Sequence, residues 1–393
     1  MDIVHKTKVK TKRIKDEKLA LLVEPDYRSP YIPFGLAKIA TYLRNNGWRV
    51  SYVKGRKKLG LSPKQIWITT LFTFKHKITI ETILFYKKYY PDADIMIGGI
   101  FASLMPDLIH KHTGIRPYVG MIRDAEKCAP AYDLFPDVDY SLGFTSRGCK
   151  NRCHYCVVPK IEGDMMDIKG WERCLKEDSK EVILWDNNFF AKSRGSIERD
   201  VDILEEFGKP VDFNQGLDCR LYNKRYHALM KRLTVRPIRF AFDHMGEDGL
   251  CQKAISMWSG SDGKGEWYNK DSNVNVYVLF NCLDTPADFY YRVREVVRWG
   301  GIPYPMWYVP YNDINREHVG KNWTPIQRNN ARLMVWRQGQ VTVGSKDEFE
   351  AFWGSTPEQY IEKLSDPLLR ERIESTRNRR QAERFKEVMD END

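Results

Sequence analysis

The chain has 393 residues, a formal net charge of +10 at pH 7 and a pI near 9.0, which allows two or three domains with a sizeable core. Its 42% hydrophobic and 30% charged residues are typical of a globular protein and exclude a disordered or collagen-like chain. The longest uncharged run, Trp299–Asn312, contains three prolines and is shorter than the about 20 apolar residues of a membrane-spanning helix. Because the chain starts with a polar Met-Asp-Ile-Val-His-Lys segment, we expect a cytoplasmic protein without membrane contact.

The first part of the chain alternates between apolar runs and helical periodicity. After a basic extension at residues 1–17, the pattern predicts helices over 34–46 and 78–89 and four strands, over 19–23, 48–53, 66–72 and 95–97. Strands that alternate with helices favour an open parallel sheet. We therefore predict a Rossmann-like domain over residues 18–130.

A second series of strands follows Pro130. Strands are predicted over 140–145, 181–185, 211–214, 238–242, 273–280 and 303–309, with helices between most of them. Six strand–helix units are too few for a closed eight-stranded barrel, so residues 131–321 are expected to form a partial (β/α)6 TIM-type barrel. Residues 322–393 are predicted to be helical, with breaks at Gly344 and near Pro357. Chemistry is expected at the carboxyl ends of the barrel strands, where the loops converge.

Three cysteines follow the first barrel strand in a glycine-containing loop. The run from Phe144 to Pro159 places Cys149, Cys153 and Cys156 in a CxxxCxxC spacing. Three thiolates so spaced can hold three corners of an iron–sulfur cubane and leave the fourth iron without a protein ligand. A zinc site is the alternative, with His154 as the fourth ligand. The other cysteines show no second CxxC pair, which favours the cluster.

This motif resembles the signature of the radical S-adenosylmethionine (SAM) superfamily, in which an aromatic residue, here Tyr155, precedes the third cysteine. The resemblance implies a 4Fe-4S cluster that binds SAM and, after one-electron reduction, cleaves it to methionine and a 5'-deoxyadenosyl radical. That radical removes a hydrogen atom from the substrate. An electron donor of the flavodoxin or ferredoxin type is then an expected partner.

The first domain resembles the cobalamin-binding domain that precedes many radical SAM barrels. The likeness rests on the run from Tyr31 to Trp48 and on Ile97-Gly-Gly-Ile. The loop Glu24–Ser29, however, lacks the histidine of the cobalt-ligating DxHxxG motif. We therefore expect the domain to be vestigial and the enzyme to work without cobalamin.

Polar residues follow each of the middle barrel strands, where SAM would need hydrogen-bonding partners. With Tyr155, the candidate cofactor-binding residues are Asp186, Asn187, Asn188, Gln215, Asp218 and Arg220, and Arg220 is the candidate clamp for a carboxylate. Asp243 and His244 are candidates for proton transfer, or alternatively for SAM binding or helix capping. Two thiols at strand ends, Cys282 and Cys219, are candidate hydrogen-atom donors, with core packing as the alternative.

The charge balance bears on the substrate. Residues 1–19 and Arg370–Lys386 each hold seven Lys/Arg against three Asp/Glu. Tyrosines and tryptophans between Trp299 and Trp336 are interleaved with Lys321, Arg328, Arg332 and Arg337. Stacking on bases and contact with phosphate would explain this composition, and so would domain packing with solvated ends. The sequence thus favours a radical SAM enzyme acting on DNA or RNA, with three alternatives: an enzyme acting on a small molecule or peptide, a cobalamin-dependent methyltransferase, and a non-enzymatic Fe-S protein.

Overall fold

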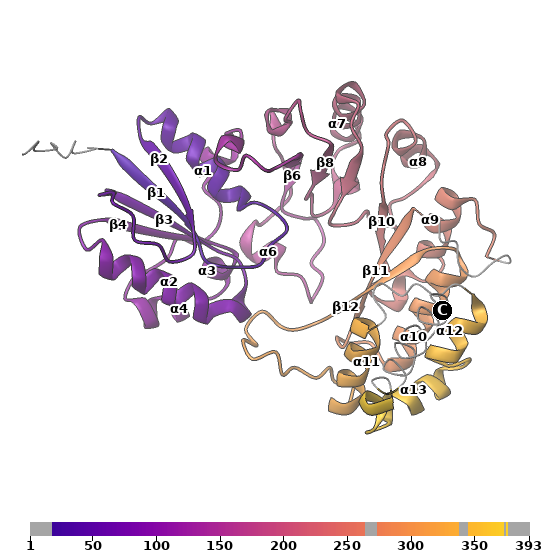
Figure 1. Ribbon diagram of the computed structural model, residues 1–393. Coiled ribbons are helices and arrows are strands. Elements are labelled where there is room, and N and C mark those ends of the chain that lie inside the picture. Colours follow the sequence, from indigo (N-terminus) through magenta and orange to yellow (C-terminus); the bar gives the residue numbers. More distant parts are fainter. Residues whose placement is uncertain (1–17, 264–272, 338–344, 373–374, 376–393) are drawn as a thin grey trace, which may run out of the picture. The chain divides into compact units, whose positions relative to one another are not determined.

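The computed structural model describes residues 18–263, 273–337, 345–372 and 375. The chain divides into two compact units, Met1–Val138 and Asp139–Asp393 (Figure 1). The predicted basic extension over residues 1–17, residues 376–386 of the second basic segment and the predicted break at Gly344 lie outside the described residues.

The first unit is built on a four-stranded parallel sheet in the order β2-β1-β3-β4. Its strands are β1 Leu19–Glu24, β2 Arg49–Lys54, β3 Gln65–Thr70 and β4 Asp94–Gly99, and its helices are α1 Phe34–Asn45, α2 His76–Tyr89, α3 Ile100–Leu104, α4 Pro106–Thr113 and α5 Arg123–Glu126. Every residue of β1 is buried, because Leu21 and Val23 pack into the core on one face and Ala20 and Leu22 into the core on the other. The predicted Rossmann-like sheet is confirmed.

The segment after Pro130 still belongs to this first unit. Ala131 donates its backbone N–H to the Ala37 carbonyl at 2.9 Å and packs into the core beside α1. Asp133 forms a two-point ion pair with Arg44 at 2.8 and 2.7 Å. The division therefore falls after Val138, whereas the sequence pattern placed it after Pro130.

Six parallel strands form the second unit, as predicted. They are β5 Tyr140–Gly143, β8 Glu181–Leu184, β9 Val211–Phe213, β10 Ile238–Ala241, β11 Val274–Phe280 and β12 Ile302–Trp307. Hydrogen bonding groups them as β5-β8-β9 and β10-β11-β12, and two parallel bridges, Val211 to Val235 and Leu217 to Phe240, link the two groups. The result is a partial barrel (Figure 1). A short antiparallel pair, β6 Ser146–Arg147 and β7 Met166–Asp167, was not predicted.

The described part of this unit also contains α-helices. They are α6 Val158–Ile161, α7 Arg194–Phe207, α8 Lys224–Met230, α9 Leu250–Ser259, α10 Pro286–Arg298, α11 Pro325–Arg337, α12 Lys346–Trp353 and α13 Pro357–Ser365. The break near Pro357 is confirmed, since α12 ends at Trp353 and α13 starts at Pro357. Phe289 and Tyr290 of α10 share one core with Trp353 and Tyr360, so the C-terminal helices pack against the barrel.

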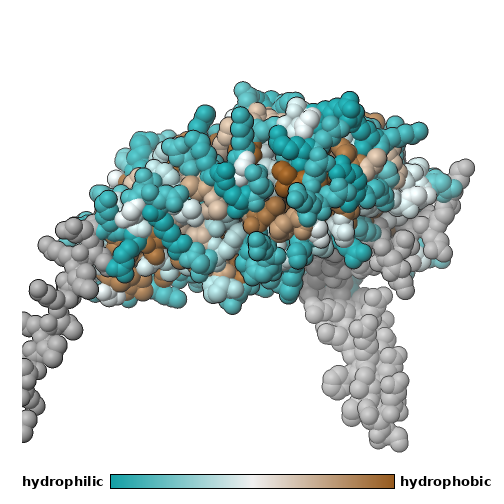
Figure 2. Space-filling view, turned by 90° about the horizontal axis from the view of Figure 1, so that it is seen from above, coloured by the Kyte–Doolittle hydropathy of each residue, from teal (hydrophilic) through white to brown (hydrophobic). Residues whose placement is uncertain are grey.

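The described surface is mixed in character. On the face seen in Figure 2, hydrophilic side chains predominate and hydrophobic ones form small patches between them. Among the described helices, none combines the length and the apolar character needed to cross a bilayer.

Candidate functional site

The three cysteines lie on a loop that leaves the carboxyl end of β5. Gly148 turns this loop with a φ of +72°, and a Cβ there would lie 2.2 Å from the Asp164 carbonyl oxygen, so only glycine fits. The Glu162 carboxylate accepts hydrogen bonds from the Gly148 N–H at 2.8 Å and from Arg147 Nη1 at 2.9 Å. One part-buried carboxylate therefore fixes the turn that precedes Cys149.

Asp186, predicted as a cofactor ligand, supports the base of this loop. It is 4% exposed and accepts hydrogen bonds from the Thr145 N–H at 2.9 Å and from the Thr145 and Ser146 hydroxyls at 2.6 Å each. Behind it, Lys192 donates to the Thr145 hydroxyl and forms a fully buried ion pair with Asp200 at 2.5 Å. Both carboxylate oxygens of Asp186 are thus used to position the cysteine loop.

The thiols of the loop lie within electrostatic reach of one another. Burial raises the pKa of Cys149 and of Cys156, and the Cys153 thiol raises both further. Across the described ranges, no three His, Cys, Asp or Glu side chains converge on one point suited to a single metal ion. His154, the fourth ligand that the zinc alternative requires, places its Nε2 atom 3.2 Å from Cys282 Sγ.

A polar group beside the cysteine loop joins residues from three segments. Asp218 accepts hydrogen bonds from Asn188 Nδ2 at 2.9 Å and from Asn151 Nδ2, within the cysteine loop, at 3.3 Å. Arg220 binds Asp218 through two nitrogens at 2.7 Å each. Although burial favours the neutral carboxyl, these donors keep the pKa of Asp218 below its usual value. The guanidinium fork predicted to clamp a ligand carboxylate is therefore engaged with Asp218.

Asn188 offers a free acceptor at the same place. The residue is 4% exposed, and its Oδ1 atom is buried without a hydrogen-bond partner among the described residues. Because a buried acceptor without a partner costs about 1–3 kcal/mol, this oxygen is suited to a ligand donor such as an ammonium group.

The next two candidate cofactor-binding residues, Asn187 and Gln215, differ in their contacts. Asn187 Nδ2 donates to Glu162 at 2.8 Å and to the Gly148 carbonyl at 3.3 Å, so it positions the cysteine loop. Gln215 is exposed, and no hydrogen bond joins its side chain to another described residue.

Asp243 and Tyr155 connect the fourth barrel strand to the cysteine loop. The Tyr155 hydroxyl donates to Asp243 Oδ2 at 3.0 Å, and the Leu279 N–H donates to Asp243 Oδ1 at 3.1 Å. Burial raises the pKa of both groups. His244 instead accepts from the Gly246 N–H at 3.1 Å and caps the short helix at Met245–Glu247. The two members of the predicted pair therefore have different hydrogen-bond partners: Asp243 binds Tyr155 of the cysteine loop, and His244 caps the short helix.

The two candidate thiols lie in different surroundings. Cys282 is 8% exposed, lies next to His154 of the cysteine loop, and donates its N–H to Asp284 at 2.9 Å. Cys219 donates its thiol to the Ala241 carbonyl at 3.4 Å and is part of the barrel core. The role of either thiol as a hydrogen-atom donor stays a prediction.

Glu247 contacts both Asp243 and His244, and its protonation is expected to make the stability of the protein depend on pH. It accepts the N–H groups of Asp243 at 2.7 Å and His244 at 3.4 Å, and burial, with Asp243 nearby, raises its pKa to about 7 from 4.5. The folded state therefore holds a proton that the unfolded state releases above about pH 4.5. The contribution of Glu247 to stability is expected to fall by up to about 3 kcal/mol as pH rises from about 4.5 to about 7.

The Glu247→Gln variant retains an acceptor oxygen and does not titrate. The difference in unfolding free energy between wild type and this variant, measured by urea denaturation across that pH range, isolates the contribution of Glu247. A difference that does not change with pH would contradict the assignment.

Glu162, Lys192, Glu247 and Arg292 support the site and were not predicted. Arg292, on α10, is fully buried and binds the Phe242 and Leu279 carbonyls at 2.8 and 2.7 Å and Asp284 at 2.8 Å. It thereby ties together the ends of β10 and β11. Apart from the amphipathic pattern of α10, no sequence signal marks these four charged residues as supports of the site.

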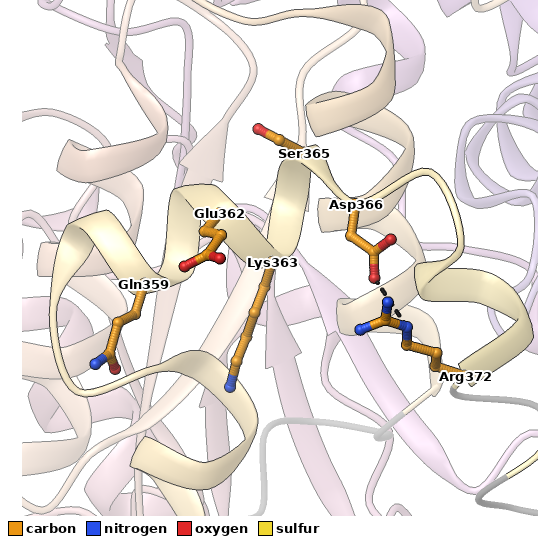
Figure 3. Close-up of a pocket in the computed structure, with 6 residues that line it drawn as sticks. All are labelled: Gln359, Glu362, Lys363, Ser365, Asp366 and Arg372. Atoms are coloured by element: carbon orange, nitrogen blue, oxygen red, sulfur yellow. Dashed lines mark ion pairs between the residues drawn. The ribbon is translucent and has the colours of Figure 1, made fainter.

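A cavity lies apart from the cysteine loop, at α13. It measures about 700 Å³ and is lined by residues of and after α13: Gln359, Glu362, Lys363, Ser365, Asp366 and Arg372 (Figure 3). Three of its charged groups have partners: Arg372 pairs with Asp366 at 3.3 Å, and Lys363 donates to the Ala351 and Phe352 carbonyls. This cavity contains none of the predicted site residues.

Comparison with known proteins supports the fold. No family model matches the chain, and no curated protein matches it. Among solved structures, the chain is similar to the radical S-adenosylmethionine methyltransferase TsrM from Kitasatospora setae, which was solved with cobalamin and a [4Fe-4S] cluster bound. The TM-score is 0.60 at 13% identity, over 74% of this chain and 75% of that chain. The two proteins share a fold. A Rossmann-like unit followed by a partial barrel is thereby confirmed.

Proposed function

We propose that this chain is a radical SAM enzyme in which Cys149, Cys153 and Cys156 hold a 4Fe-4S cluster. The proposal is carried by the CxxxCxxC loop, which a glycine turn and the Glu162 and Asp186 carboxylates fix at the carboxyl end of the first barrel strand. The thiols are close enough to influence one another, and the unpartnered Asn188 oxygen lies in the adjacent polar group. These residues fit a cluster with bound SAM.

The cluster and SAM, when bound, would supply the one-electron cleavage of SAM and the abstraction of a substrate hydrogen atom. The protein's own residues would bind and orient these groups. Asn188 Oδ1 would accept a hydrogen bond from the SAM ammonium, and the Tyr155–Asp243 hydrogen bond would fix the aromatic side chain next to Cys156. Cys282 is the proposed hydrogen-atom donor of the pair of thiols, since it lies against the cysteine loop. A flavodoxin- or ferredoxin-type protein is the proposed electron donor.

The proposed substrate is a base within DNA or RNA. A net charge of +10 suits a polyanion. A small molecule or a peptide is the alternative substrate, and a salt-dependent gel shift with duplex DNA and transfer RNA distinguishes the alternatives, because only phosphate contacts make binding fall steeply with salt.

The proposed enzyme class is tested by quantifying 5'-deoxyadenosine after anaerobic reconstitution and reduction in the presence of SAM. Formation of 5'-deoxyadenosine is expected. A reconstituted protein that contains iron and forms none would instead be a non-enzymatic Fe-S protein.

A cobalamin-dependent methyltransferase is the second candidate function, favoured by the likeness to TsrM. We expect no binding of hydroxocobalamin at micromolar concentration. The loop after β1 has no histidine. Glu24, the last residue of β1, already accepts hydrogen bonds from the Tyr52 hydroxyl at 2.5 Å and from Lys54 at 3.1 Å.

The measurement is the visible absorbance of protein separated from free cofactor by gel filtration, with hydroxocobalamin alone as the control. A stoichiometric cobalamin spectrum in the protein fraction would contradict this expectation and favour methyl transfer.

A further inference from the structure

Three arginines surround the tryptophan at the end of β12. The guanidinium carbons of Arg332, Arg316 and Arg328 lie 3.8, 4.7 and 5.5 Å from the centre of the Trp307 ring. Arg316 belongs to the loop that follows β12, and the other two belong to α11. We call Trp307 with these three residues the arginine cluster.

The arginine cluster carries more positive charge than its surroundings neutralise. Among the described residues, no carboxylate pairs with Arg328 or Arg332. Arg328 is 9% exposed and donates only to backbone carbonyls, those of Arg316 at 3.3 Å and His318 at 3.2 Å. Asp313, in the same loop, attracts Arg316 and accepts the His318 N–H at 2.6 Å.

Several polar atoms of this region have no partner in the described part of the chain. The Nε atoms of Arg328 and Arg332, Trp307 Nε1 and His318 Nε2 are all buried and unpartnered. Burial, with Arg316 and Arg328 nearby, lowers the pKa of Arg332, yet a guanidinium stays charged at neutral pH. Such a set of donors, charged and already gathered, is suited to an anion with several acceptor oxygens.

The arginine cluster is tied to the same strand end as Cys282. Asn281 Nδ2 donates to the Tyr308 and His318 carbonyls at 3.1 and 3.2 Å, and the second of these carbonyls also binds Arg328. In the same loop, the Tyr311 hydroxyl accepts a hydrogen bond from Lys160 at 3.1 Å. Lys160 belongs to α6, which follows the third cysteine along the chain. The loop that carries Arg316 therefore connects the arginine cluster to the cysteine loop.

We propose that the arginine cluster binds a phosphate group of a nucleotide-containing substrate at the rim of the barrel. This inference rests on the proposed function, because it names the group by which the substrate of that site is held. Arginine forks match phosphate oxygens in two-point hydrogen bonds, and the tryptophan keeps the forks in place by stacking. A single phosphate and a polynucleotide backbone present the same chemistry here.

The test is fluorescence polarisation of a fluorescein-labelled single-stranded oligonucleotide with the full-length reconstituted protein across a salt series. Arg332→Gln is expected to weaken binding about tenfold, as removal of a charge-assisted hydrogen bond predicts. The slope of log K against log salt should fall by about 0.7 for each phosphate that the variant no longer neutralises. Arg332→Lys keeps the charge and should retain the slope, which distinguishes a missing phosphate interaction from misfolding.

Arg232→Gln is the matched control, because Arg232 follows α8, ahead of the amino end of β10, and pairs with Asp202 at 2.6 Å and with Glu205. It should bind as the wild type does. Competition by a nucleoside monophosphate would identify a single phosphate as the ligand, whereas displacement by unlabelled oligonucleotide alone would identify the polynucleotide backbone.

Equal affinity and salt slope for wild type and Arg332→Gln would overturn the inference, as would an equal loss in Arg232→Gln. Arg332-dependent binding to phosphatidylglycerol vesicles without oligonucleotide binding would overturn it too. The proposed function is tested separately, by measuring 5'-deoxyadenosine formation in the wild type. Formation of 5'-deoxyadenosine without Arg332-dependent binding contradicts only this inference, and the reverse result contradicts only the proposed function.

Discussion

Replacement of Cys153 by alanine is expected to abolish 5'-deoxyadenosine formation and to leave the protein without its full complement of about four irons per chain. A cubane held by three thiolates loses one corner when any of the three is removed. The glycine turn and the Glu162 and Asp186 contacts fix the loop without help from the Cys153 side chain, so the variant should fold. Iron analysis and quantification of 5'-deoxyadenosine after anaerobic reconstitution provide the measurement.

Cys128→Ala is the control for this variant. Cys128 lies in the first unit and its thiol donates to the Asp124 carbonyl at 3.5 Å, so iron content and SAM cleavage should match those of wild type. Full SAM cleavage by Cys153→Ala would refute the assignment of the cluster ligands.

Replacement of Arg292 by leucine is expected to destabilise the protein by about 3–5 kcal/mol. The guanidinium is fully buried, and its removal leaves the Asp284 carboxylate, whose side chain is 7% exposed, without its charge partner. The Phe242 and Leu279 carbonyls lose a donor as well. Urea denaturation followed by far-UV circular dichroism measures the decrease in stability.

Arg298→Leu, on the same helix, is the matched control. Arg298 is 43% exposed and pairs with Glu295 at 3.3 Å, so its removal should cost less than about 1 kcal/mol. The double variant Arg292→Leu/Asp284→Leu removes both charges and should recover much of the stability. Equal costs for Arg292→Leu and Arg298→Leu would show that the buried pair contributes no more than an exposed one.

The strands of both units could be predicted because parallel strands covered on both faces read as continuous apolar runs. β1, with all six residues buried, is the clearest case. The boundary between the units was harder, since Pro130 interrupts the pattern while the contacts of Ala131 and Asp133 continue into the first unit. Spacing along the chain does not show such contacts.

The candidate site was predictable to a smaller extent. The cysteine spacing identifies the loop directly, and the polar residues at the strand ends do gather beside it, as Asp218, Asn188 and Asp243 show. Which of them remains free to bind a ligand depends on partners that the sequence does not specify. Arg220 is engaged with Asp218, two residues earlier, whereas Asn188 keeps one free oxygen. For Glu162, the sequence gave no sign of its contacts with Gly148 and Arg147.

The prolines of β12 have a consequence for the open side of the barrel. In the described part of the chain, β12 is the last strand of its sheet, and the Tyr308 N–H donates to Phe280 of β11 at 2.9 Å. Because backbone N–H groups alternate along a strand, those of Tyr304 and Met306 also point toward β11. Pro303 and Pro305 therefore occupy the positions that face the free edge of the sheet. That edge therefore lacks two of the donors that another chain would need to extend the sheet. A barrel left incomplete in this way is protected against edge-to-edge aggregation at the side where it does not close.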